Sequence, residues 1–228
     1  HWNLSISYDA KLSGPYNNLG LHYFHNGLYE EGLRNLDTAL KLDSDNPDYL
    51  FNLAQIYLVH FPQIQQLRKW KDKEKVYKEA MKCSVKAAKL APDDYEIVQD
   101  LAVNHFAAEN FGVKPDWNAA AMAWQATRNL ARTQDERFYT WLNEARVRIR
   151  DGRNDEARKC LAEALALRPQ SEVAQKLMAD VGGSVLQEDK SAGSAESASP
   201  SPTPETRSRS NFARPGPRSS PEWPRGQR

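Results

Sequence analysis

The residue types that most often carry chemistry are few and scattered in this sequence of 228 residues. His22 and His25 are three residues apart, which would place both on one face of a helix, but no Cys or carboxylate accompanies them at the spacing of a metal site. We interpret Cys83 and Cys160, which fall in predicted second helices of different repeats, as small buried apolar residues. We therefore expect no metal site and no cofactor.

Adjacent acidic residues occur as Glu30-Glu31, Asp93-Asp94 and Asp135-Glu136. Each pair lies at a turn or a predicted helix start, where the helix dipole favours negative charge without any acid–base role. The sequence also has no glycine-rich phosphate loop, no H-E-x-x-H, no nucleophile elbow and no C-x-x-C pair. These observations predict a binding protein that is not an enzyme and has no catalytic residue.

The charge balance excludes a strong electrostatic field around the whole chain. The net charge is +1 with 27% charged residues, so we expect no general attraction to nucleic acid or to an acidic membrane. No apolar run approaches the ~18 residues needed to cross a bilayer. Because the sequence starts at His1 rather than Met, we expect a processed product or a fragment, soluble in the cytoplasm or, if a leader was removed, in the periplasm or outside the cell.

Two predicted helices between Tyr16 and Asn46 define the element on which the fold depends. Apolar residues recur in both at the spacing of an amphipathic helix. They are Leu19, Tyr23 and Phe24 before the turn at Asn26-Gly27, and Leu33, Leu36 and Leu40 after it. Gly20 and Gly32 supply small residues where the helices must approach. A single hairpin of this kind cannot close a core, so we expect it to stack against others.

The same pattern returns along the chain. Asn18-Leu19-Gly20 recurs 34 residues later as Asn52-Leu53-Ala54, and Gly152–Ala157 mirrors Gly27–Gly32. Small residues keep a common spacing in three places: Gly32, Ala39 and Ser44; Ala80, Ala87 and Pro92; Ala157, Ala164 and Pro169. This periodic pattern resembles the tetratricopeptide repeat (TPR) family. The resemblance implies an all-α fold, a right-handed superhelix of stacked antiparallel helix pairs, with about four repeats and a capping helix.

We divide the chain into three parts. Residues 1–12 are a partial repeat or an irregular segment: the alternation of apolar and polar residues fits a strand, whereas Asn3-Leu4-Ser5 with Tyr8 fits the remnant of a preceding first helix. Residues 13–183 are the TPR solenoid, ending in a capping helix before Gly182-Gly183. Residues 184–228 are rich in Ser, Pro and Arg. We expect them to form a disordered tail that either keeps the chain in solution or binds nucleic acid.

An insertion follows Phe61, and we expect its helix-forming residues to extend the next helix backwards over about 63–90. It carries a cluster of basic residues around a tryptophan. These residues are Arg68, Lys69, Trp70, Lys71 and Lys73, with further charges to position 75. The cluster predicts either a basic arm that touches RNA, an acidic partner or a membrane surface, or a solvated helix supported by its own ion pairs.

The third and fourth repeats depart from the pattern at two places. A second insertion, 110–116, replaces a tight turn, and Asp116 is expected to cap the helix that carries Trp124, which we expect to pack between hairpins. In the fourth repeat, Glu144 stands where other first helices have Leu. We expect less regular packing against the third repeat there.

In the TPR family the first helices line a concave groove that holds a peptide or helix of a partner protein, so the resemblance implies the same for this chain. The periodicity assigns a set of residues to that face. They are Asn17, Leu21, Phe24, Phe51, Asn52, Gln55, Leu58, Gln99, Val103, Phe106, Leu142, Arg146 and Ile149. We expect Phe51 and Phe106 to act as anchors. In the alternative interpretation, about half of the set completes the core between repeats.

One TPR subtype clamps a chaperone's C-terminal carboxylate with Lys, Asn and Arg on three first helices. Asn52 matches the Asn of the middle helix. Asn17, Glu96 and Asp100 stand where the basic residues belong, and acids there would repel a carboxylate. We therefore predict an adaptor or scaffold that binds a partner segment of another kind. The alternative function is nucleic-acid or anionic-surface binding through residues 68–75 and the Arg-rich tail.

Overall fold

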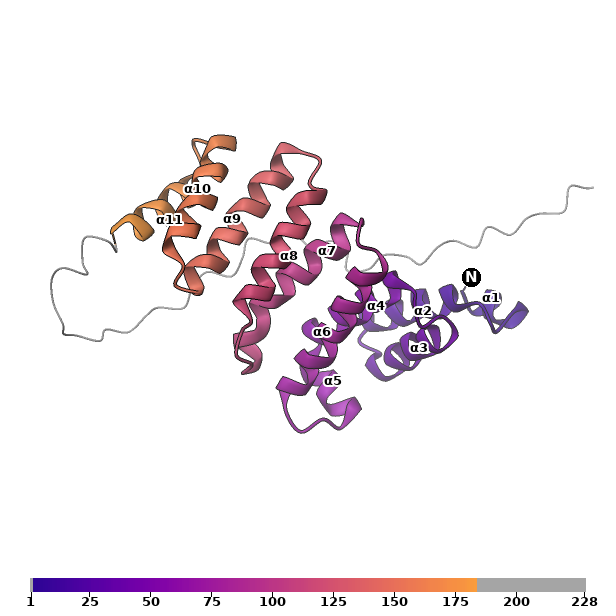
Figure 1. Cartoon of the computed structure of the whole chain (residues 1–228). Helices are drawn as coiled ribbons and strands as arrows, with labels where there is room; N and C mark the ends of the chain where they lie inside the picture. Colours follow the sequence, from indigo (N-terminus) through magenta and orange to yellow (C-terminus); the bar gives the residue numbers. More distant parts are fainter. Residues whose placement is uncertain (1, 184–228) are drawn as a thin grey trace, which may run out of the picture. The chain divides into compact units, whose positions relative to one another are not determined.

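The computed structural model describes residues 2–183, and the predicted tail at 184–228 lies outside the described residues (Figure 1). This part of the chain consists of helices and turns and contains no strand. The α-helices are α1 Trp2–Tyr8, α2 Ser13–His25, α3 Tyr29–Leu42, α4 Pro47–Val59, α5 Phe61–Arg68, α6 Lys73–Leu90, α7 Tyr95–Asn104, α8 Trp117–Leu130, α9 Gln134–Arg150, α10 Asn154–Leu167 and α11 Glu172–Gly183. A 3₁₀ helix, η1, spans His105–Phe111. The all-α prediction is therefore confirmed.

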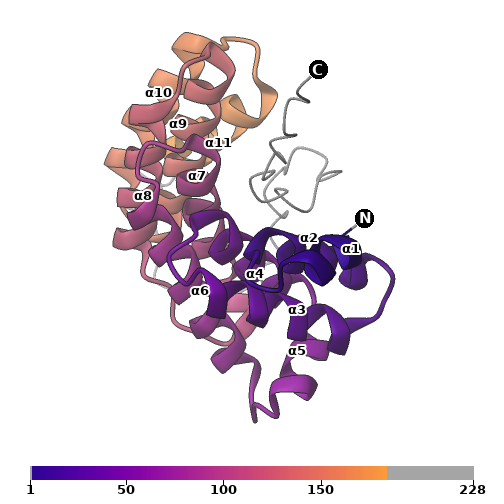
Figure 2. The same cartoon turned by 90° about the vertical axis from the view of Figure 1, so that its right-hand side faces the viewer.

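The helices pack in two compact units. The N-terminal unit comprises the described residues up to 92 together with 110–113, and the C-terminal unit comprises 93–109 and 114–183. In the first unit α2 packs on α3 and α4 packs on α6; in the second, α7 packs on α8 and each later helix packs on the one before it (Figures 1 and 2). Each unit is thus a stack of helix pairs.

Small residues and tight turns explain the hairpin of α2 and α3. Gly27 has φ +75°, the left-handed backbone that a side chain disfavours, and Gly152 occupies the matching turn between α9 and α10 with φ +73°. Where the two helices cross, a Cβ on Gly20 would lie 2.8 Å from Leu36 Cγ, and one on Gly32 would lie 2.5 Å from a ring carbon of Phe24. The predicted close approach at these glycines is confirmed.

Helix α1 does not have the position of a preceding repeat's first helix, which was one of the two expectations for this segment. Residues 2–8 are helical, which decides against a strand, and α1 packs on α2. Four residues separate α1 from α2, as they separate α3 from α4 and α10 from α11. Since those are connections from a second helix to the next first helix, α1 has the position of a second helix. Its apolar face is open: Leu4 is 56% and Tyr8 83% exposed.

The insertion after Phe61 does not extend α6 backwards, so that expectation was wrong. It forms a separate helix, α5, which ends where Lys69 adopts a left-handed backbone with φ 54°. Asp72 then accepts the backbone N–H of Lys75 and caps α6 at its true start. A capping carboxylate and one residue in the left-handed region therefore break a stretch that consists of good helix formers.

The C-terminal unit has two apolar clusters. Trp124 is fully buried in the one between α7, α8 and α9, with Phe106 and Val147, as predicted for a residue packed between hairpins. Asp116 accepts the N–H of Ala119 and caps α8, which was also predicted. The second cluster joins α9 and α10 to α11 through buried Ala174 and Val181, and α11 runs through Gly183 rather than stopping before it.

Candidate partner-binding faces on the first helices

The best-formed apolar face on a first helix of the N-terminal unit lies on α4. Asn46 accepts the N–H groups of Asp48 and Tyr49, and Pro47 occupies the first turn, so the helix start is fixed by its own sequence. Phe51 and Leu58 are seven residues apart, two helical turns, and both remain half-exposed. Gln55 lies between them and is 7% exposed. This stripe offers two apolar side chains, with a buried amide between them.

The residues predicted for the same face of α2 are buried. Leu21 and Phe24 belong to the core, and Phe24 packs between the rings of Tyr29 and His60 at 5.7 and 5.3 Å. Asn17 is fully buried, so α2 offers none of its three predicted contact residues to a partner. The assignment failed here because periodicity identifies a face of a helix but not whether a neighbouring helix covers it.

Asn52 on α4 is also fully buried and has a structural role. Its Nδ2 donates to Asn17 Oδ1 at 3.2 Å, which ties α4 to α2 across the repeat boundary. An amide paired in this way satisfies polar atoms inside the stack and cannot meet a ligand. The two asparagines that the sequence assigned to the partner-binding face are therefore an inter-repeat contact.

In the C-terminal unit the predicted set divides in two. Gln99 and Val103 on α7 and Arg146 on α9 are half-exposed, and Arg146 Nη1 donates to Asn143 Oδ1 at 3.1 Å. Leu142 is buried in the cluster with α10 and α11, against which the half-buried Ile149 also packs. Leu142 therefore contributes to the core rather than to a contact surface.

Phe106, which we expected to be an anchor, is a core residue. It is 9% exposed and its ring lies 6.2 Å from Trp117 and 6.3 Å from Trp124. The guanidinium of Arg150 lies 5.6 Å from the same ring and donates to Glu109 Oε2 at 3.1 Å. The 3₁₀ turn that begins at His105 ends the regular α7 helix just before Phe106, so the helical spacing used for the prediction no longer applies.

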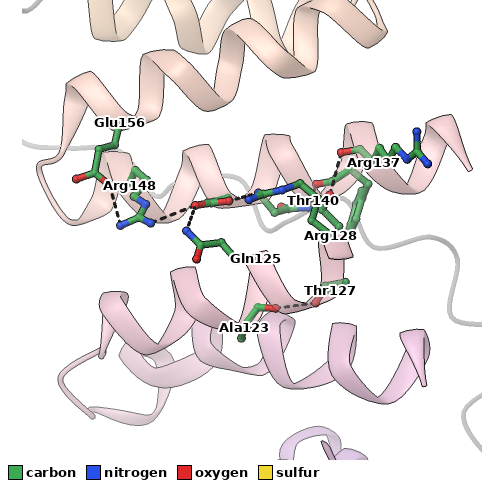
Figure 3. A network of polar contacts seen from close by, with 11 residues as sticks. Ala123, Gln125, Thr127, Arg128, Arg137, Thr140, Arg148 and Glu156 are labelled. Atoms are coloured by element: carbon green, nitrogen blue, oxygen red, sulfur yellow. Dashed lines mark hydrogen bonds and ion pairs between the residues drawn. The ribbon is translucent and has the colours of Figure 1, made fainter. Parts of the chain in front are cut away.

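A buried ion network replaces the apolar contact usual at the same position of a first helix (Figure 3). Glu144 on α9 is 2% exposed. Its Oε1 accepts from Gln125 Nε2 at 3.0 Å and from Arg148 Nη2 at 3.1 Å, and its Oε2 pairs with Arg128. Three helices meet in this network, because Arg128 and Gln125 lie on α8 and Arg148 continues to Glu156 on α10 at 3.0 Å.

The sequence contains the signal for this network, although our prediction stopped at Glu144. An acid followed four residues later by an arginine places both on one face of a helix. Arg148 Nη2 and Glu144 Oε1 form that pair in the structure. The Arg128 guanidinium also lies 3.6 Å from the ring centroid of Trp141, so it binds Glu144 while stacked on an aromatic face. The packing of α8 against α9 is thus fixed by directional contacts rather than loosened.

The predicted basic arm does not project from the fold. Arg68 donates to both carboxylate oxygens of Asp37, at 2.8 and 2.5 Å, and to the hydroxyl of Tyr57 at 2.9 Å. Trp70 packs edge-on against the Tyr57 ring at 5.6 Å, and burial raises the pKa of Tyr57 to about 12. The two residues that would give the arm its specificity therefore stabilise the N-terminal unit instead.

The remaining predicted arm residues are lysines with separate surroundings. Lys69 and Lys71 are exposed in the turn between α5 and α6, and Lys73 donates to the carbonyl oxygen of Asn110. The structure shows a basic turn that is held to the unit by Arg68 and Trp70 on one side and by Lys73 on the other. The alternative interpretation, a solvated helix supported by its own ion pairs, describes only the start of α6, where Lys75 pairs with Glu79.

The two thiols differ in exposure but not in reactivity. Cys160 is buried as predicted, whereas Cys83 on α6 is only partly buried. Burial raises the pKa of each thiol to about 11. Both are therefore protonated near neutral pH, a state in which cysteine is a weak nucleophile. No group of three or more metal-ligating side chains occurs within the described residues.

Stacked helix pairs define an α-helical repeat protein, a class that serves as protein–protein interaction scaffolds. Residues 20–58 match the family model described as TPR repeat, and residues 138–171 match the one described as tetratricopeptide repeat. These two matches confirm that the chain contains tetratricopeptide repeats, as the resemblance implied. No curated protein matches the sequence.

Solved structures agree on the fold. MamA is 18% identical with a TM-score of 0.57, covering 78% of this chain and 85% of MamA. A TPR-containing protein from Cytophaga hutchinsonii is 16% identical with a TM-score of 0.56 over 78% of this chain and 64% of its own. PilF of Pseudomonas aeruginosa is 15% identical, with a TM-score of 0.52 over 77% and 69% of the two chains. At this identity the likeness concerns the fold alone. In the part of the chain that the structure describes, no helix combines the length and apolarity needed to cross a membrane.

Proposed function

We propose that this protein is a non-enzymatic adaptor whose N-terminal unit binds an apolar segment of a partner protein along α4. The observation that carries the proposal is the half-exposure of Phe51 and Leu58 on one face of that helix. Side chains two turns apart match the spacing at which an extended or helical peptide presents alternate apolar residues. Gln55 between them is buried, so the two apolar side chains form the contact.

The C-terminal unit offers a more polar contact surface. Gln99, Val103 and Arg146 are its half-exposed members from the predicted set. We propose that they contact polar residues of the same partner segment or of a second one. The apolar face on α4 is expected to supply most of the affinity, because burying apolar area contributes ~25 cal/mol per Å².

The experiment uses a display library of random peptides selected on the intact chain. We expect Phe51→Ala combined with Leu58→Ala to weaken the binding of selected peptides by about tenfold or more, the loss expected when two half-buried apolar contacts are removed. Leu42→Ala is the matched control, because Leu42 on α3 is 41% exposed and lies outside this face. It should leave the affinity unchanged.

Circular dichroism and thermal unfolding of each variant show whether the fold is retained. If the double variant binds the selected peptides as tightly as the parent chain while Leu42→Ala weakens them, the contact face is not on α4. Phe106→Ala is not a binding variant, since its side chain belongs to the core. We expect it to lower the melting temperature.

A further inference from the structure

Helix α6 carries a continuous row of lysines. Lys75, Lys78, Lys82, Lys86 and Lys89 follow one another at intervals of three or four residues, so they lie along one face of α6. Together with Lys73 they make six lysines against two glutamates in this helix. The whole chain has a net charge of only +1, so this basic excess is local.

An apolar depression lies beside the row. It has a volume of about 390 Å³ and is lined by three apolar and four charged residues: Tyr77, Met81, Val85, Lys75, Lys78, Lys82 and Glu79. Met81 and Val85 are half-buried, and Tyr77 is nearly covered because Phe111 packs on it at 5.7 Å. The apolar side chains are therefore partly covered and lie beside the lysines.

The lysines around the depression are incompletely neutralised. Lys75 and Lys82 share one carboxylate oxygen, Glu79 Oε1, at 2.7 and 2.8 Å, and Lys78 pairs with Glu74. Exposed pairs of this kind contribute only about 0–1 kcal/mol each, so a ligand's carboxylates can displace them readily. Three ammonium groups thus face two carboxylates, which leaves a net positive rim around an apolar centre.

We propose that this surface, α6 from Lys75 to Val85, docks an acidic amphipathic helix of a partner protein. One apolar side chain of the partner fills the depression, and carboxylates one turn to either side pair with Lys75, Lys78 and Lys82. An apolar centre with a charged rim is the usual anatomy of a helix-binding interface. The site is on a second helix, so it is separate from the α4 face proposed above.

Two other anionic occupants fit the apolar centre less well. A nucleic-acid backbone would pair with the lysines but has no apolar group to fill the depression at the same time. An anionic bilayer takes up a broad, exposed apolar face, whereas Met81 and Val85 are half-buried and Tyr77 is nearly covered. Charge complementarity together with shape therefore favours an acidic polypeptide.

The test measures binding to the intact chain of a defined probe, a fluorescent helical peptide with leucines along one face and glutamates beside them. We expect Lys78→Glu with Lys82→Glu to weaken binding about tenfold or more at low salt, because two attractions become repulsions. Met81→Ala should weaken it several-fold at any salt concentration. Lys41→Glu, a reversal of an exposed lysine on α3, is the matched control and should have little effect.

Charge exchange makes the test specific. A probe in which lysines replace the glutamates should bind the Lys78→Glu, Lys82→Glu variant better than it binds the parent chain. Circular dichroism confirms that the variant keeps its helices. Phe51→Ala with Leu58→Ala should leave probe binding unchanged, so failure of the α4 face and failure of this site can be told apart.

The proposal is overturned if the reversed variant and the Lys41→Glu control bind the acidic probe equally. It is also overturned if the parent chain does not bind the acidic peptide but binds single-stranded RNA or phosphatidylserine vesicles through the same lysines. Binding that responds to the lysine reversals but not to Met81→Ala would exclude the apolar depression, and with it an amphipathic occupant.

Discussion

Glu144 shows how one residue can change the kind of contact that holds two repeats together. Leu19 with Tyr23, and Leu53 with Tyr57, occupy the positions that Glu144 and Arg148 occupy in the fourth repeat. The apolar pairs contribute by burial, whereas the ionic pair depends on Arg128 and Gln125 from the neighbouring helix. A buried ion pair stabilises little in net terms, but loss of one partner leaves the other charge without compensation.

We therefore predict that Glu144→Ala lowers the free energy of unfolding by about 3 kcal/mol, because Arg148 remains buried with only Glu156 as its partner. Replacing the pair together, Glu144→Leu with Arg148→Tyr, should recover part of this loss, because Arg148 is no longer buried without its acid, whereas Arg128 still lacks its partner. Urea unfolding followed by circular dichroism measures both. A double variant that is less stable than Glu144→Ala would contradict this account.

At the scale of helices, the pair α2 and α3 depends on two glycines that lie where the backbones cross. A methyl group on Gly20 would lie 2.8 Å from Leu36 Cγ and 3.0 Å from the carbonyl oxygen of Gly32. Neither atom can move far, because Leu36 is buried and the oxygen belongs to a helix backbone. The two helices would have to separate.

Gly20→Ala is accordingly expected to lower the free energy of unfolding by about 1–3 kcal/mol, the usual cost of overpacking a core. The matched control is Gly182→Ala in α11, where nothing lies within 4 Å of the added carbon. That change should stabilise slightly, since Ala favours a helix over Gly by about 1 kcal/mol. Equal effects of the two substitutions on the thermal midpoint would argue against a close approach at Gly20.

The helices also show what the sequence could predict and what it could not. Repeated small residues such as Gly32 and Ala157 predicted the helix pairs and their turns correctly, because a close crossing admits few side chains. The break at Lys69 was missed: no Gly or Pro marks it, and the only local signal is the capping Asp72. For the predicted contact faces, spacing placed Phe51 and Leu58 on a half-exposed side of α4, but it could not reveal that Asn17 and Asn52 pair with each other inside the stack.

At the scale of the whole chain, stability should be distributed by neighbourhood. In repeat proteins each element contacts mainly the elements beside it, so the free energy of unfolding is close to a sum of local terms. The described residues divide into two compact units, and the Gly20 crossing and the Glu144 network lie in different ones. A defect in one unit should therefore leave the helices of the other largely protected.

Hydrogen exchange read by mass spectrometry tests this expectation. Glu144→Ala should speed amide exchange in α8, α9 and α10 while α2 and α3 keep their protection. Gly20→Ala should give the opposite pattern. If either substitution accelerates exchange evenly from α2 to α11, the chain unfolds as a single cooperative body and the local account is wrong.

The carboxylate at Glu144 also restricts how modules of this protein could be rearranged. A repeat that packs on its neighbour through aliphatic side chains can be followed by many different repeats, because almost any apolar surface can form that contact. The segment 138–171 instead requires an arginine and a glutamine at fixed places on the helix before it. A chimaera that placed this segment after a generic repeat would bury the Glu144 carboxylate without a counter-charge. The contacts between α8 and α9 therefore fix the order of the last two repeats.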